Sequence, residues 1–253
     1  MIIQSATYSI IYSKANDIRR KVFNLEDKLE GIFATPFALN PIPDDAPQEI
    51  PRIQATSKLG HSNLGVSLNN TQFSVNFDEN FNRDIDKCLK YIEERILKIY
   101  DALDDDILKD CLFTGLTLNI LFDQLNHEDP IELISNNLFN VKSNLKPFDI
   151  NSKVTYAILD KYYVNISCSN VRNYSGSFVT NETPLCELNL DSHMIGINLD
   201  INDRYAFNFK ERYRSNKDEI NKIVKISESI LKNKLEKYIK EGVLQFDGEC
   251  LSQ

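Results

Sequence analysis

Residues 82–103 read NRDIDKCLKYIEERILKIYDAL, and residues 216–240 read NKDEINKIVKISESILKNKLEKYIK. In each stretch apolar side chains recur every three or four residues, which is the spacing of a helix with one face on a core. The first stripe consists of Ile85, Cys88, Leu89, Ile92, Ile96, Ile99 and Leu103, and the second of Ile220, Ile223, Val224, Ile230, Leu231, Leu235 and Tyr238. Because each long helix follows a run of short strands, the chain is predicted to repeat one plan twice.

Alternating apolar and polar residues predict the strands that precede each long helix. In the first half they are expected over 2–12, 52–57, 63–69 and 71–77, and in the second over 112–122, 153–169, 173–180, 184–190 and 194–202. The segment 153–169 is expected to contain a hairpin at Asp160-Lys161. A short helix follows the first strand of each half. Gly31 ends the first of these helices, and Asp129-Pro130 begins the second.

The predicted fold is therefore α+β, with duplicated β-α-β-β-β-α halves and an antiparallel sheet that carries the long amphipathic helices on one face. The first half spans 1–108 and includes a proline-rich arm at 36–51. The second half spans 109–242, and residues 243–253 form a flexible tail. The halves align in the order of their elements and share no motif. One large α+β domain with accidentally similar halves is the alternative interpretation.

Composition narrows the class of protein. The chain has 253 residues, a net charge of −8 and a sequence pI of about 5.0, so it repels nucleic acid on average. The N-terminal MIIQSATYSIIYSK lacks the basic and apolar regions of a signal peptide, and no stretch is long enough to span a membrane. Five cysteines without close spacing favour reduced, buried thiols. These features predict a cytoplasmic protein.

The arm, PFALNPIPDDAPQEIP, holds five of the eight prolines of the chain. Proline lacks a backbone donor and fixes φ, so the arm is expected to be extended and to form no inner strand. Its apolar side chains favour contact with the fold or with a partner, beside a sheet edge or face near 52–77 that accepts an added strand. The predicted partner-binding residues are Phe37, Leu39, Ile42, Ile50 and Arg52.

The segment 204–240 is the basic part of an acidic chain, with eleven lysines and arginines against five acids. Such an asymmetry can receive an acidic partner or nucleic acid, although a helix with a solvated basic face is the simpler interpretation. Guanidinium groups bind phosphate bidentately. The candidate anion-binding residues are therefore Arg204, Arg212 and Arg214.

No pattern of catalytic residues emerges from the sequence. Nucleophile-elbow, phosphate-loop and dinucleotide-binding motifs are absent, and no histidine or cysteine pair has metal-ligand spacing. We therefore predict a non-enzymatic protein without cofactor or metal. A metal-dependent hydrolase built on Asp200 or on the acidic residues around His127 is the remaining alternative.

Several segments resemble an uncharacterised, sporadically distributed bacterial family of similar length. They are PRIQATSKLGHSNLGVSLNNTQFSVNF at 51–77, GINLDIND at 196–203 and the FNF at 207–209. The resemblance supplies no catalytic residues. The succession of sheet and long helix also looks similar to SecB-like chaperones, which accompany some bacterial toxin–antitoxin and phage-defence systems.

These observations together predict a binding module that holds another protein or a peptide. The resemblances imply a chaperone-like or antiphage-defence accessory role, and we expect a homodimer. A nucleic-acid or nucleotide-binding accessory that uses 204–240 is the second hypothesis.

Overall fold

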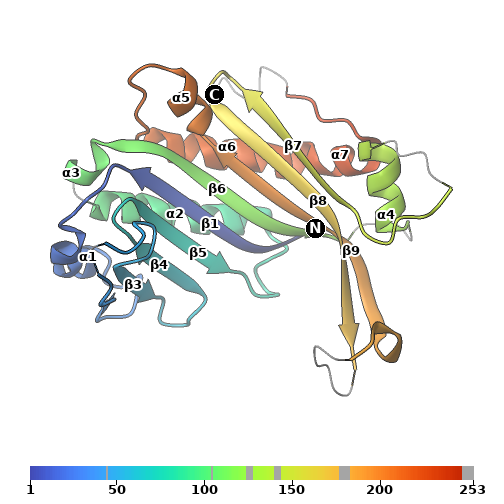
Figure 1. Ribbon diagram of the computed structural model, residues 1–253, viewed down its shortest axis with the longest axis horizontal. Coiled ribbons are helices and arrows are strands. Elements are labelled where there is room, and N and C mark those ends of the chain that lie inside the picture. Colours follow the sequence, from blue (N-terminus) through green and yellow to red (C-terminus); the bar gives the residue numbers. More distant parts are fainter. Residues whose placement is uncertain (44, 104, 124–127, 140–143, 177–182, 247–253) are drawn as a thin grey trace.

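A computed structural model describes residues 1–246 except 44, 104, 124–127, 140–143 and 177–182 (Figure 1). It contains helices and one antiparallel sheet, so the α+β class is confirmed. None of the helices among the described residues is both long and apolar enough to cross a lipid bilayer.

The first half begins with a long strand and ends with a long helix. Its elements are β1 (Ile2–Tyr12), a 3-10 turn η1 (Ile18–Lys21), α1 (Val22–Lys28), β2 (Ala38–Leu39), β3 (Ile53–Thr56), β4 (Ser62–Val66), β5 (Asn70–Asn76) and α2 (Ile85–Ala102). Asp84 caps α2 by accepting a hydrogen bond from the backbone N–H of Lys87, which satisfies a free donor of the first turn. A short helix α3 (Asp105–Leu108) leads into the second half.

The second half follows the same order. Its elements are β6 (Cys111–Phe122), α4 (Pro130–Leu133), a π-helical segment η2 (Ile134–Phe139), β7 (Asn151–Ile158), β8 (Tyr162–Ser175), a 3-10 turn η3 (Leu185–Glu187), β9 (Asn189–Asn202), α5 (Arg204–Phe209), α6 (Asp218–Asn233) and α7 (Leu235–Glu241). Asp129 caps α4 and Pro130 is its first residue, as the sequence predicts. Gly242 ends α7 with a φ of 70°, a conformation that glycine adopts without strain.

Two expectations for the second half are wrong. The segment 153–169 forms the predicted hairpin, with β7 and β8 paired on either side of the turn at 159–161. The separate strands expected over 173–180 and 184–190 are not found among the described residues, because β8 continues to Ser175 and η3 lies just before β9. The helix expected over 216–240 breaks at Lys234 into α6 and α7. The break lets the Lys234 ammonium donate to the carbonyl of Gln245, and Asn137 on η2 donates to the last carbonyls of α7.

The nine strands in the described part of the chain form one sheet, in the order β2-β3-β4-β5-β1-β6-β9-β8-β7. β1 and β6 lie side by side in the middle. Outward from β1 come β5, β4 and β3, and outward from β6 come β9, β8 and β7. The first strand of each half is thus central, and the last strand of each half lies next to it.

The strand register is also the same in both halves. Ser5 on β1 faces Asn76 on β5, and Gly115 on β6 faces Asn202 on β9, at matching places. Farther out, the β4–β5 pair Leu64 and Phe73 corresponds to the β8–β9 pair Ile166 and Leu199. In the middle of the sheet Thr7 on β1 faces Thr117 on β6. The register that relates the two halves also matches Thr7 with Thr117. A pseudo-two-fold axis therefore passes between Thr7 and Thr117.

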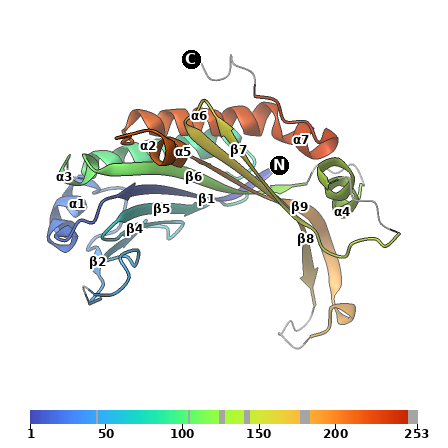
Figure 2. The same ribbon diagram turned by 45° about the horizontal axis from the view of Figure 1, so that its top comes forward.

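The core lies between the sheet and its helices. Alternate residues of the strands are buried on this side, such as Tyr8 on β1, Leu118 on β6 and Leu199 on β9. Figure 2 shows α2, α6 and α7 along one side of the sheet, and Lys232 on α6 forms an ion pair with Asp86 on α2. The sheet curves away from these helices. Its other face is concave, between the β2–β4 end and the projecting ends of β8 and β9 (Figure 2).

Candidate functional site

A buried arginine is one of the residues that tie the proline-rich arm to the protein. Arg52 is 0% exposed, and its guanidinium donates to arm carbonyls at 2.7 to 3.4 Å. The accepting residues are Pro43, Ala46, Pro47 and Ile50. Phe37 is buried as well, with its ring edge-on to Phe33 at 6.2 Å. The expectation that Arg52 and Phe37 contact a partner is therefore wrong, because both side chains hold the arm in place.

The rest of the arm remains accessible. Leu39 and Ile50 are 49% and 39% exposed, and Ile42 is half-buried. The expected free sheet edge near 52–77 is not found, because β3, β4 and β5 each pair with a strand on both sides. The arm itself supplies the outermost strand, β2, whose two residues pair with Ile53 and Gln54.

The three candidate anion-binding arginines are exposed around α5. The Arg204 guanidinium lies 5.2 Å from the ring centroid of Phe113, and Arg214 donates to the carbonyl of Tyr213. Arg212 has a φ of 57° in the loop after α5. Aromatic rings surround α5 as contacting pairs, which are Phe113–Phe207, Tyr163–Tyr205 and Tyr205–Phe209. The structure thus places Arg204 beside aromatic rings, a feature that the charge pattern alone did not reveal.

A line of mostly uncharged polar side chains crosses the concave face of the sheet. One row of directly opposed residues crosses eight strands from β3 to β7, and we call it the polar row. In spatial order it consists of Thr56, Asn63, Ser74, Thr7, Thr117, Asp200, Asn165 and Thr155. With neighbouring strands about 4.8 Å apart, the row extends over roughly 30 Å. Asp200 is its single charged member.

The polar row has the same residue types on both sides of the pseudo-two-fold axis. Threonine, asparagine and threonine recur at matching places, and only Ser74 and Asp200 differ. Thr56 donates to the Asn63 side-chain carbonyl at 2.9 Å, and Thr155 donates to that of Asn165 at 2.7 Å. The same side-chain hydrogen bond is thus present in both halves.

The core-facing residues next to the polar row show no such identity. Their matching pairs are Ala55 with Val154, Leu64 with Ile166, Phe73 with Leu199 and Tyr8 with Leu118. A packed core tolerates exchange among apolar side chains of suitable total volume. The identities on the open face are not required by packing, so they point to the chemistry of that face.

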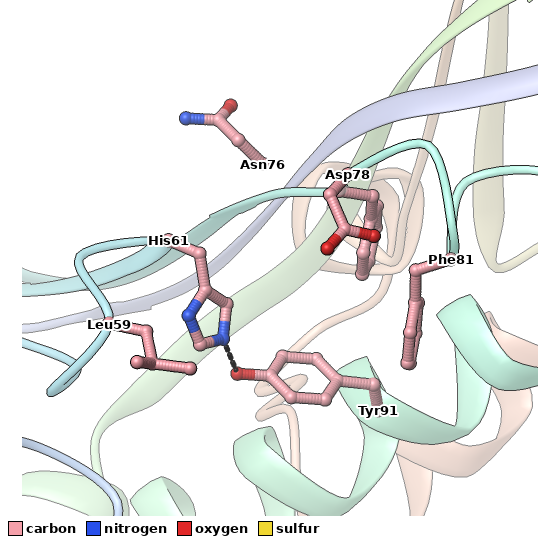
Figure 3. A pocket seen from close by; sticks show the side chains of 7 residues that line it. Leu59, His61, Asn76, Asp78, Phe81 and Tyr91 are labelled. Carbon is pink, nitrogen blue, oxygen red and sulfur yellow. Dashed lines mark hydrogen bonds between the residues drawn. The ribbon is translucent and has the colours of Figure 1, made fainter.

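The ends of the strands carry a second feature, which differs between the halves. In the first half a pocket of about 200 Å³ opens between the β3–β4 turn, the residues after β5 and α2 (Figure 3). It is lined by Leu59, His61, Asn76, Phe77, Asp78, Phe81 and Tyr91, and we call it the strand-end pocket. His61 Nε2 lies 2.7 Å from the Tyr91 hydroxyl, and its Nδ1 lies 3.2 Å from the Ser57 hydroxyl. The imidazole is therefore held between two hydroxyl groups.

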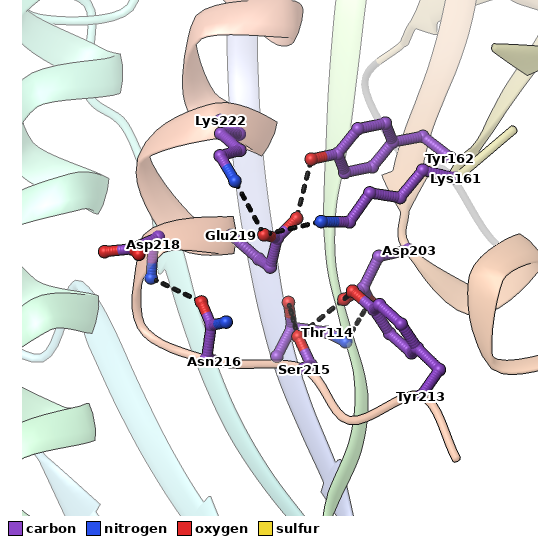
Figure 4. A network of polar contacts seen from close by, with 10 residues as sticks. All are labelled: Thr114, Lys161, Tyr162, Asp203, Tyr213, Ser215, Asn216, Asp218, Glu219 and Lys222. Carbon is purple, nitrogen blue, oxygen red and sulfur yellow. Dashed lines mark hydrogen bonds and ion pairs between the residues drawn. The ribbon is translucent and has the colours of Figure 1, made fainter. Parts of the chain in front are cut away.

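In the second half the corresponding place is filled by a buried polar network (Figure 4). Glu219, in the first turn of α6, accepts hydrogen bonds from Tyr162 at 2.6 Å, Lys161 at 2.8 Å and Lys222 at 2.9 Å. Asp203 follows β9 and accepts from the Thr114 N–H at 2.6 Å and from two hydroxyls. These belong to Tyr213, at 2.6 Å, and Ser215, at 2.5 Å.

The two carboxylates of this network have opposite electrostatic environments. Burial raises the pKa of Asp203 above its ordinary value, although the hydrogen bonds that it accepts act against this shift. Burial also acts to raise the pKa of Glu219, but the hydrogen bonds from Lys161, Tyr162 and Lys222 outweigh it, and the pKa of Glu219 is lowered. Both side chains are fully enclosed by the fold, with exposed fractions of 0% and 1%. Their geometry supports a role in stability.

The structure describes only part of the residues of the hydrolase hypothesis. Asp200 accepts side-chain hydrogen bonds from Thr117, Asn165 and Asn202, and His127 lies outside the described residues. Among the residues that the structure describes, no group of three His, Cys, Asp or Glu side chains could hold a metal ion. A scan of protein-family models, a search of curated proteins and a search of solved structures each returned no match.

The sequence did not predict the polar row or the strand-end pocket. It does contain one repeated pattern that marks the two strand ends. The pattern N-x4-F-N occurs after β5, from Asn76 to Asn82, and after β9, from Asn202 to Asn208. The expectation that the halves share no motif is thus wrong, and this pattern aligns the strand ends at which the pocket and the network lie.

Proposed function

We propose that the protein is a non-enzymatic binding module that holds another protein or a peptide on the concave face of its sheet. The observation that carries the proposal is the polar row, with residue identities in both halves where packing requires none. Hydroxyl and amide side chains donate and accept hydrogen bonds, so they suit the N–H and C=O groups of a polypeptide. The near absence of charge in the row favours a polypeptide over a polyphosphate backbone.

The two halves support a second part of the proposal, that they arose by duplication. The strand order, the register and the N-x4-F-N pattern each relate one half to the other. A single domain with accidentally similar halves offers no reason for matching Thr–Asn hydrogen bonds on the open face. In this view duplication extended one small binding face into a surface that crosses eight strands.

The sharpest test places bulk and charge at the centre of the concave face. The double variant Thr7→Arg, Thr117→Arg changes two half-buried positions beside the pseudo-two-fold axis. Affinity purification from the native host, with mass spectrometry and nucleic-acid detection on the same eluate, is expected to lose the specific protein partners of the wild type. Glu94→Arg on the exposed side of α2 is the matched control and retains them.

The outcome that contradicts the proposal is equally direct. If the double variant keeps its fold, as judged by circular dichroism and thermal unfolding, and still recovers every wild-type partner, the concave face is not the binding surface. Partners lost by both the double variant and Glu94→Arg would also count against it, since the loss would not depend on the face.

The arm contributes to the proposal through its exposed side chains only. Removing 36–51 is expected to disturb the fold, because Arg52 would be buried without the carbonyls that it now contacts. The double variant Leu39→Asp, Ile50→Asp alters the accessible surface and leaves this arrangement intact. Reduced partner recovery with unchanged thermal stability would assign the arm to the binding surface, and full recovery would exclude it.

A second candidate function rests on the surroundings of α5. Single-stranded nucleic acids bind where cationic side chains lie beside aromatic rings that accept stacked bases. Arg204 lies against Phe113, and Phe209 is largely exposed next to Tyr205. A gel-shift assay over a range of salt concentrations is expected to show binding that weakens with salt and with Arg204→Ala, Arg212→Ala, Arg214→Ala together. Absence of binding at low salt excludes this candidate.

A further inference from the structure

We propose that the strand-end pocket binds a small quaternary ammonium compound. No part of the proposed binding face is needed for this inference, which rests on the shape and charge of the pocket alone. The pocket lies within a single half of the molecule and combines aromatic walls with one carboxylate (Figure 3).

The aromatic side chains form two walls that meet at a right angle. The rings of Phe77 and Phe81 are nearly parallel, with centroids 5.6 Å apart and an interplanar angle of 5°. Tyr91 stands at 82° to Phe77 and at 80° to Phe81, with centroids 6.2 and 5.9 Å away. The face of an aromatic ring attracts cations, and aromatic cages of this kind recognise methylated ammonium groups.

The charge distribution favours a cation. Asp78 lines the pocket, and its carboxylate points into the space between His61 and Phe81, above the Tyr91 ring (Figure 3). No lysine or arginine lines the pocket. The Arg95 guanidinium lies 5.0 Å from the Tyr91 ring centroid without lining the pocket, so this ring already engages one cation elsewhere.

The size of the pocket limits the ligand. A volume of about 200 Å³ is smaller than the roughly 300 to 1,000 Å³ of sites that enclose drug-sized molecules. A quaternary ammonium group with a short substituent is compact, carries one positive charge and keeps an apolar surface of methyl groups. It therefore matches the aromatic walls and the carboxylate at once, whereas a strongly hydrated inorganic cation matches only the carboxylate.

The test compares choline with its uncharged carbon analogue, 3,3-dimethylbutan-1-ol, by isothermal titration calorimetry and ligand-observed NMR. The two molecules share size and shape, so the difference in affinity measures the contribution of the positive charge. Choline is expected to bind the full-length protein at least about fivefold more tightly than the alcohol at constant ionic strength. Equal affinity for both, or no binding of choline at millimolar concentration, would overturn the proposal.

Variants locate the site. Asp78→Asn removes the charge and keeps an oxygen that can accept the existing hydrogen bond from the Asn80 N–H, so the fold is preserved. This variant is expected to lower the affinity for choline about tenfold and to leave the affinity for the alcohol unchanged. Phe81→Leu is expected to lower the affinity for choline as well. Glu79→Gln, which alters the neighbouring acid outside the pocket, is the matched control and retains affinity within about twofold. An equal loss in Glu79→Gln and Asp78→Asn would refute the assignment.

Discussion

The two halves share a backbone plan and differ where the strands end against the long helices. In the first half Leu59, Phe77 and Tyr91 surround an open pocket. In the second half the matching turn, strand end and helix supply Lys161, Asp203 and Glu219, which close the space with a buried network. Phe77 and Asp203 lie at matching places, since each follows the last paired residue of its strand and donates its backbone N–H to the neighbouring central strand, at Gln4 and Thr114. One plan has therefore produced a cavity on one side and a polar core on the other.

This difference points to separate roles for the features that the halves share and for those in which they differ. The polar row is alike in both halves and spans the whole face, so it suits a single extended partner. Among the described residues the strand ends of the two halves differ, because those of the first half line a pocket and those of the second half hold a buried polar network. The second half holds two buried carboxylates with shifted pKa values, Asp203 and Glu219, so its stability is expected to respond to pH.

The largest expected effect is that of Glu219→Gln, which breaks the network of the second half. The variant leaves the ammonium of Lys161 without its anionic partner, and Lys161 is 24% exposed. Loss of a buried ion-pair partner costs about 3 to 5 kcal/mol, and partial exposure of the lysines reduces this to about 2 to 3 kcal/mol. Urea denaturation measures the difference. The matched change Glu94→Gln on α2 should leave the midpoint unchanged, and an equally small effect of Glu219→Gln would contradict the structure.

The two carboxylates are expected to respond to pH in opposite directions. The pKa of Glu219 is lowered in the fold, so its contribution to stability is present at neutral pH and is lost as the pH falls. The pKa of Asp203 is raised, so its ionisation costs stability, and this cost disappears as the pH falls. Between pH 7 and pH 4 the deficit of Glu219→Gln relative to the wild type should shrink, whereas that of Asp203→Asn should grow. Urea midpoints at four pH values decide this, and parallel slopes would contradict it.

In the first half, Tyr91→Phe is expected to have a moderate effect. The substitution keeps the ring of the strand-end pocket and removes the hydroxyl that bonds to His61 at 2.7 Å. Because the hydrogen bond is only partly buried, its loss should cost about 1 kcal/mol. Thermal unfolding measures this. A loss as large as that of Glu219→Gln would mean that the pocket supports the fold as strongly as the network does.

The smallest effects are expected in the polar row, where the halves should behave alike. Thr56→Val and Thr155→Val each remove the hydroxyl that donates to the neighbouring asparagine. Both hydrogen bonds are exposed, so each variant should lose about 0.5 kcal/mol or less in urea denaturation. Similar losses of unfolding free energy in the two variants would show that the two hydrogen bonds are equivalent. A difference above about 1 kcal/mol would show that the two bonds are not equivalent.

Local patterns in the sequence were sufficient to predict most elements. The alternation in β1 and the helical spacing of α2 correspond to the structure closely, because each depends on neighbours in sequence. The break at Lys234 was not predictable, since no proline or glycine marks it and the contact that accompanies it lies in the following segment. Leu244 and Phe246 pack against the core, so the expected loose tail does not begin at residue 243.

The candidate sites were harder to predict than the fold. The sequence predicts a contact role for Arg52 because a charged side chain is normally exposed, whereas its burial depends on carbonyls that the arm brings together. The polar row combines residues from eight strands, and each of them is an ordinary surface residue in its own strand. Only the order and register of the strands place these residues in line, and neither can be read from a single strand.

The facing threonines at the centre of the sheet have a consequence for direction. A surface whose two sides match presents the same contacts to a chain that runs one way and to a chain that runs the opposite way. Thr7 and Thr117 therefore cannot orient an asymmetric partner. The direction of such a partner has to be set by positions at which the two sides differ, such as Ser74 and Asp200, or else the partner is itself symmetric.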